Sequence, residues 1–98
     1  MEVTVRDVPD RNRYEAHLGD DLAGFLEYEE AGHGSVRVLV HTEVPEAFEG
    51  KGIGSALARF ALDDLRERQI TVRPVCPFVK GWIERHPDYA DLVLHGDR

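Results

Sequence analysis

Apolar and polar residues alternate along the first half of the chain, which is the pattern of half-buried β-strands. Four such runs occur, at residues 3–5, 13–18, 22–28 and 35–44. A hairpin signal at Gly19-Asp20-Asp21 separates the second run from the third. Because tight connections join only antiparallel strands, the short links between these runs predict an antiparallel meander.

The run at residues 35–44 is the clearest of the four and divides its side chains into two sets. One set shares a face whose valines we expect to point into the core: Val36, Val38, Val40, Thr42 and Val44. The other set shares the opposite face: Arg37, Leu39, His41 and Glu43. Pro45 follows, and because proline has no N–H to donate, pairing with a neighbouring strand should falter there.

The second half of the chain changes to helical spacing. Between residues 53 and 68 the apolar residues recur every third or fourth position: Ile53, Ala56, Leu57, Phe60, Ala61 and Leu65. A fifth strand at residues 70–75 should run parallel to the fourth, because a helix lies between them. Pro77 suits the first position of a second helix, and Pro87 ends it. Phe78 and Trp82, at helical spacing, are expected in the core. The predicted fold is a single α+β domain over residues 1–98.

A glycine-rich loop, Glu49-Gly50-Lys51-Gly52-Ile53-Gly54, leads directly into the first helix. Glycine lets the backbone turn tightly and lets its N–H groups approach a ligand. A helix N-terminus offers unpaired N–H donors and the positive end of the helix dipole, so the loop is a candidate phosphate site. A simple turn is the alternative. The spacing excludes a P-loop, and Ser55 stands where a dinucleotide-binding fingerprint beginning at Gly50 needs glycine or alanine.

Composition narrows the class of partner. The chain has 98 residues and a formal net charge of −7, which argues against a nucleic-acid partner. The charge could steer a cationic amine or simply keep the protein in solution. No apolar run is long enough to span a bilayer, and no secretory signal is visible. A single cysteine excludes an internal disulfide and suits the cytoplasm. The histidines show no metal-site spacing, and a monomer or weak dimer is expected.

Three motifs in order resemble the GNAT acetyltransferases, in particular the small single-domain YjdJ type. They are His41-Thr42-Glu43-Val44-Pro45 before the glycine loop, the loop itself with Ser55-Ala56-Leu57, and Cys76-Pro77-Phe78-Val79 with Glu84-Arg85-His86-Pro87-Asp88-Tyr89 after it. The resemblance covers about residues 22–93. It implies a minimal GNAT-like fold and an acetyl-CoA-dependent N-acetyltransferase that passes acetyl to an amine, without a metal.

The resemblance also implies where acetyl-CoA would lie. The pantetheine arm would run beside the fourth strand at Thr42 and Val44. The pyrophosphate would lie on the loop residues Gly50, Lys51, Gly52, Ile53, Gly54 and Ser55. Lys80 could reach the nucleotide phosphates or be only a solvated helix residue. Glu49 departs from the glutamine or arginine of many GNAT proteins, and we expect its side chain to face solvent.

Cys76 is the sharpest candidate for chemistry, because it ends a strand and precedes a helix N-terminus, where a thiol ionises more readily. It could carry the acetyl group, line the thioester site, or be a small buried hydrophobe. Glu43 and His41 could take a proton from the amine, or be solvated side chains without a role. The chain lacks the N-terminal helices of larger relatives, so a non-catalytic acyl-CoA-binding module is the second hypothesis. A structural domain without a ligand is a weaker third.

Overall fold

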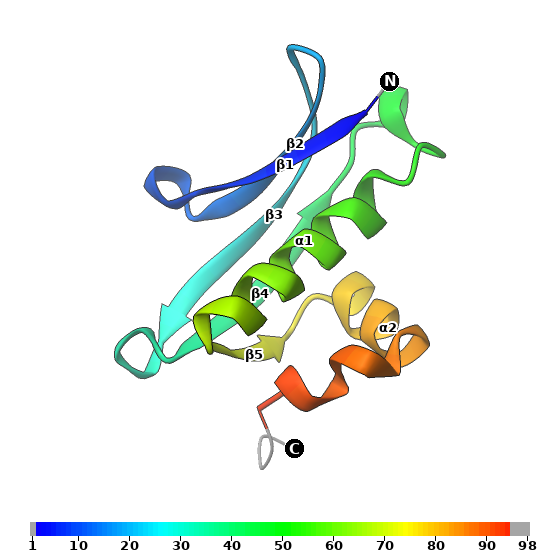
Figure 1. Ribbon diagram of the computed structural model, residues 1–98. Coiled ribbons are helices and arrows are strands. Elements are labelled where there is room, and N and C mark those ends of the chain that lie inside the picture. Colours follow the sequence, from blue (N-terminus) through cyan, green and yellow to red (C-terminus); the bar gives the residue numbers. More distant parts are fainter. Residues whose placement is uncertain (1, 95–98) are drawn as a thin grey trace.

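Five strands form one sheet in the order β1-β2-β3-β4-β5 in the computed structural model, which describes residues 2–94 (Figure 1). The first four strands are antiparallel neighbours, and β5 runs parallel to β4. The strands are β1 (Val3–Val8), β2 (Arg13–Leu18), β3 (Asp21–Ala31), β4 (Val36–Glu43) and β5 (Thr71–Pro74). The helices are α1 (Ile53–Arg68) and α2 (Pro77–Arg85), with 3-10 turns at Pro9–Arg11, Gly32–Gly34, Glu46–Phe48 and Pro87–Leu92. The predicted α+β fold with its parallel fifth strand is confirmed.

Both α-helices lie on one face of the sheet. α1 packs along β1, β2 and β3, and α2 packs on β4 and β5 beside it (Figure 1). Buried side chains from both layers meet between them, among them Tyr14, Leu26, Leu39, Leu57 and Trp82. Burial of this apolar surface supplies the main driving force for folding. Within residues 2–94, no α-helix covers the opposite face of the sheet.

The predicted inward face of β4 is wrong at Val36 and Val38 but right at Thr42 and Val44, because a β-bulge lies between the two parts. Tyr28 pairs with Leu39 and Glu27 pairs with His41, so Val40 is an extra residue without its own partner on β3. An extra residue reverses the alternation of faces beyond it.

The bulge exchanges the two sets of side chains on β4. Before it, Leu39 is fully buried against the helices, and Val36 and Val38 are only partly buried. Beyond it, Thr42 turns to the helix side, where its hydroxyl oxygen lies 3.3 Å from the Cys76 sulfur. His41 and Glu43 consequently share the face without helices.

Two aromatic residues expected in the core are partly exposed instead. Phe60 is 38% exposed and Phe78 is 39% exposed, whereas Leu57 and Trp82 are buried as predicted. The buried face of α1 contains Leu57, Ala61 and Leu65, so Phe60 lies beside this face. The Phe60 and Tyr14 rings meet edge to face, with their centroids 6.0 Å apart.

Arg37 is buried, although the alternation of side chains placed it on the face opposite the valines. Its guanidinium donates to Glu30 at 2.8 Å, to Asp7 at 3.3 Å and to the Tyr14 hydroxyl at 2.9 Å, and it lies over the Tyr28 ring. A buried charge is tolerated only when it is paired and hydrogen-bonded in this way. The network connects four strands far from the glycine loop.

Candidate active site

The glycine loop enters α1 through two residues in the left-handed region of backbone space. Gly50 has φ +80° and Gly52, the N-cap of α1, has φ +75°. Glycine adopts this conformation without the steric cost that a Cβ imposes. An ideal Cβ at either position would meet no atom within 4 Å, so the loop is open to solvent. The glycines therefore serve the backbone turn rather than close packing.

The first turn of α1 presents free backbone donors. Gly52 supplies no side-chain cap, and the first bond of the turn is the one from the Ala56 N–H to the Gly52 carbonyl. The N–H groups of Ile53, Gly54 and Ser55 have no acceptor in the described part of the chain. No acidic residue occupies this turn. Unpaired donors at the positive end of a sixteen-residue helix make a site suited to an anion.

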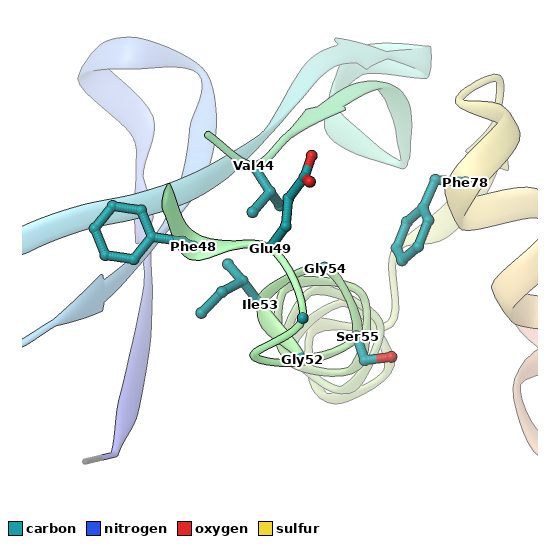
Figure 2. A pocket seen from close by; sticks show the side chains of 9 residues that line it. Val44, Phe48, Glu49, Gly52, Ile53, Gly54, Ser55 and Phe78 are labelled. Atoms are coloured by element: carbon teal, nitrogen blue, oxygen red, sulfur yellow. The ribbon is translucent and has the colours of Figure 1, made fainter. Parts of the chain in front are cut away.

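A groove of about 260 Å³ opens in front of these donors. Its walls come from the end of β4, the loop, the start of α1 and the start of α2 (Figure 2): Val44, Phe48, Glu49, Gly50, Gly52, Ile53, Gly54, Ser55 and Phe78. Glu49 is exposed, and Figure 2 shows its carboxylate directed away from Gly52 and Ser55. The Glu49 carboxylate therefore does not occupy the N–H groups at the start of α1.

Phe78 forms the α2 side of the groove and rests on Gly54. A Cβ at Gly54 would lie 2.8 Å from the end of the Phe78 ring, closer than real contacts allow. A side chain at Gly54 would therefore require the Phe78 ring to shift, whereas Gly50 and Gly52 have open space around them. The sequence singled out Gly54 correctly as part of the loop but missed its partner, because the helical spacing of Phe78 resembles that of a core residue.

The strands β4 and β5 separate close to Cys76. Their pairing runs from Val36 opposite Thr71 to Leu39 opposite Pro74. The Leu39 carbonyl then accepts both the Val75 N–H at 3.0 Å and the Cys76 N–H at 2.9 Å. β4 continues to Glu43 without β5 beside it. Its free edge can pair with an extended ligand, as sheet edges do in peptide recognition.

Cys76 is the N-cap of α2 and lies beside this separation. Its side chain is 3% exposed, and its sulfur contacts the Thr42 hydroxyl at 3.3 Å. Either of these two atoms can donate the hydrogen bond. The structure thus brings together two of the predicted site residues, one from each side of the separation.

The other two candidates for chemistry lie on the opposite face of β4. His41 Nε2 is 3.3 Å from Glu43 Oε1, and their side chains are 53% and 57% exposed. The Phe25 ring lies edge-on to the His41 ring, with centroids 6.5 Å apart. His41 and Glu43 therefore form one polar pair that meets Thr42 and Cys76 only across the strand.

The two predicted lysine contacts lie outside the groove. Lys80 lines a separate hollow with Arg73, Pro74 and Val75, near the outer edge of β5. Lys51 is exposed and does not line the groove. Tyr89, a tyrosine that could in principle donate to a leaving thiolate, lies outside the groove: its hydroxyl donates to Asp63 at 2.7 Å, and this bond raises its pKa.

Within residues 2–94, no group of three or more His, Cys, Asp or Glu side chains could hold a metal ion, and His95 lies outside the described residues. In the same part of the chain, none of the helices has the length and apolar character needed to cross a membrane.

Comparison with known proteins places the chain in a family. The family model of GCN5-related N-acetyl-transferases matches residues 13–92, and the chain belongs to this family. The protein NATD1 of Danio rerio is 36% identical over 72 residues, which cover 71% of this chain and 64% of the relative. NATD1 of Xenopus tropicalis is 37% identical over 62 residues, covering 63% and 56%. The chain thus spans less than two thirds of these relatives.

Two solved structures share the fold. The solution structure of a GCN5-like protein from Staphylococcus aureus has a TM-score of 0.69 at 19% identity, covering 97% of this chain and 96% of that one. Ard1 from Thermoplasma volcanium has a TM-score of 0.56 at 23% identity, covering 64% and 43%. At these identities the likeness concerns the fold alone.

Proposed function

We propose that this protein binds acetyl-CoA and transfers the acetyl group to an amine. The observation that carries the proposal is the uncapped start of α1. Its free donors at Ile53, Gly54 and Ser55 face a groove bordered by Val44, the residue directly after β4. Membership of the GCN5-related family supports the same reading.

The pyrophosphate of acetyl-CoA would accept hydrogen bonds from the N–H groups at the start of α1, where the helix dipole favours negative charge. The pantetheine arm would continue past Val44 along the free edge of β4. This path leads to the separation of β4 and β5, where Thr42 and Cys76 meet. The thioester would then lie beside these two side chains.

Transfer requires an amine lone pair to attack the thioester carbonyl carbon, after which the carbon–sulfur bond breaks and the CoA thiolate leaves. The attacking nitrogen must also lose a proton. His41 and Glu43, a hydrogen-bonded pair on the open face, are the groups we assign to take it, directly or through water. Donation from the Thr42 hydroxyl or the Cys76 thiol could stabilise the departing sulfur.

Labelled acetyl-CoA tests the proposal when the protein is incubated with a panel of small amines and lysine peptides. We expect labelled acetyl-amine, and we expect the double variant His41→Gln/Glu43→Gln to bind acetyl-CoA but to transfer at least tenfold more slowly. Binding without transfer to any amine would support the alternative, a non-catalytic acyl-CoA-binding module. Absence of binding would overturn both.

The YjdJ-type assignment, the cytoplasmic location and the monomer or weak dimer remain predictions from the sequence.

A further inference from the structure

Arg59 is an arginine without a carboxylate partner in the described part of the chain. Its guanidinium makes one long hydrogen bond, 3.4 Å, to the Tyr89 hydroxyl. That hydroxyl donates its own proton to Asp63 at 2.7 Å, so it can only accept from Arg59. The guanidinium has five N–H donors, and most of them are left for a further acceptor.

The other arginines of α1 are engaged differently. Arg66 makes a bidentate ion pair with the Asp91 carboxylate, with both hydrogen bonds 3.0 Å long, and it also donates to the Asp88 carbonyl at 2.8 Å. Arg68 pairs with Asp64 at 3.1 Å and with Asp7 at 3.2 Å. Among the three arginines of α1, Arg59 alone has no carboxylate partner in the described residues.

Arg59 lies one helical turn beyond Ser55, on the same flank of α1. The two residues share a support, the fully buried Trp82 of α2. The indole N–H donates to the Ser55 hydroxyl oxygen at 3.1 Å, and the Arg59 guanidinium carbon lies 5.2 Å from the centre of the indole ring. A cation held over an aromatic face keeps its N–H groups available at the ring's edge.

The hydrogen bond from the Trp82 indole also fixes the donor and acceptor roles of the Ser55 hydroxyl. An indole N–H only donates, so the Ser55 oxygen is the acceptor and its own proton has no acceptor among residues 2–94. Ser55 lines the groove in front of the α1 donors. One flank of α1 thus offers a hydroxyl donor at the groove and a guanidinium from a residue about 6 Å further along the helix axis.

CoA has two anionic groups near each other, because its ribose carries the pyrophosphate on its 5′ carbon and a separate phosphate on its 3′ carbon. We propose that Arg59 binds the 3′-phosphate, and that the protein therefore selects CoA over dephospho-CoA. The inference rests on the proposed function, because it assumes that the pyrophosphate lies at the start of α1. Arg59 is then a specificity residue that does not touch the reacting atoms.

Calorimetric titration with acetyl-CoA and with acetyl-dephospho-CoA tests the inference on the full chain. We expect the wild type to bind acetyl-CoA roughly 10- to 100-fold more tightly, the range expected for hydrogen bonds between charged groups. Arg59→Gln should reduce this ratio to about one while leaving the affinity for acetyl-dephospho-CoA within about twofold. Arg59→Lys should retain part of the preference, because it keeps the charge but loses the planar fork.

Arg66→Gln is the matched control, since it removes the same charge from the same helix two turns further on. It should leave the ratio at the wild-type value. The single tryptophan gives one indole N–H resonance, which reports whether each variant keeps α2 packed on α1.

Three results would overturn the inference. They are a wild type without preference between the two ligands, an Arg59→Gln variant that keeps the full preference, and an Arg66→Gln variant that loses it equally. If both ligands bind at the start of α1 with equal affinity, the inference fails and the proposed function stands. If neither binds, both fail.

Discussion

The Thr42 hydroxyl lies 3.3 Å from the Cys76 sulfur, across the point where β4 and β5 separate. The β-bulge at Val40 makes this contact possible, because it turns Thr42 toward the helices. The two side chains therefore belong to the inner side of the sheet, whereas His41 and Glu43 belong to the outer side. The groups assigned to take the proton therefore lie on the opposite face of β4 from the proposed thioester, and the amine's proton would reach them through water around the free edge of the strand.

This arrangement predicts how Cys76→Ser affects transfer. An amine can attack a thioester without a protein nucleophile, so we expect Cys76→Ser to keep acetyl-CoA binding and turnover within a few fold. No acetyl-enzyme should be detected by mass spectrometry. A covalent route would give the opposite result: an acetylated Cys76 peptide that transfers at a competent rate, and a loss of turnover by orders of magnitude in the variant.

Two apolar residues on α1 should differ in their effect on stability. Leu57 is fully buried, so Leu57→Ala should lower the free energy of unfolding by roughly 2–5 kcal/mol. Phe60 is 38% exposed, and Phe60→Ala should cost distinctly less although it removes more atoms. Urea denaturation of both variants checks the comparison. Equal losses would contradict the assignment of the buried face of α1.

Glu15 should make the fold sensitive to acid. Its carboxylate is buried and accepts hydrogen bonds from Arg13 at 2.8 Å and Arg11 at 3.3 Å. Burial acts to raise its pKa, but the two arginines outweigh burial and hold the pKa below its usual value of 4.5. A lowered pKa contributes stability that is complete above 4.5 and is lost as pH falls through the value in the folded protein.

The measurement is the free energy of unfolding between pH 7 and pH 3 for the wild type and for Glu15→Gln. The wild type should be more stable at neutral pH, and the gap should narrow as pH falls below 4.5. A gap that stays constant or widens with acid would show that the carboxylate is not held by the arginines in this way.

The contact between Gly54 and Phe78 should appear as a coupling between two substitutions. Gly54→Ala puts a Cβ 2.8 Å from the ring, so we expect a loss of about 1 kcal/mol, at the low end for overpacking because the ring is partly exposed. Phe78→Leu in the same chain should recover part of that loss. Strictly additive effects of the two changes on unfolding would contradict the contact.

Much of the fold is predictable because the signals are local. The glycines, the apolar stripe and the helix breakers gave α1 its bounds at Ile53 and Arg68, and Pro77 marked the start of α2. The bulge at Val40 was not predictable, because an extra residue in a strand leaves no mark in the alternation of side chains. The buried Arg37 was missed for a similar reason: its partner Asp7 lies 30 residues away.

The candidate site divides in the same way. The sequence identified the loop donors, because three glycines before a helix have a local physical meaning. It did not identify Phe78 as a wall of the groove, nor the bond from Trp82 to Ser55, because both depend on how α2 packs against α1.

The central claim is that acetyl-CoA binds with its pyrophosphate on the N–H groups at the start of α1. Nuclear magnetic resonance titration of the ¹⁵N-labelled protein with acetyl-CoA tests it most directly. We expect saturable shifts of the Ile53, Gly54 and Ser55 amide resonances at micromolar or weaker affinity. Gly52→Val, which forces a branched side chain to φ +75°, should abolish them. Binding that leaves these three amides unmoved, or that survives Gly52→Val unchanged, would contradict the account.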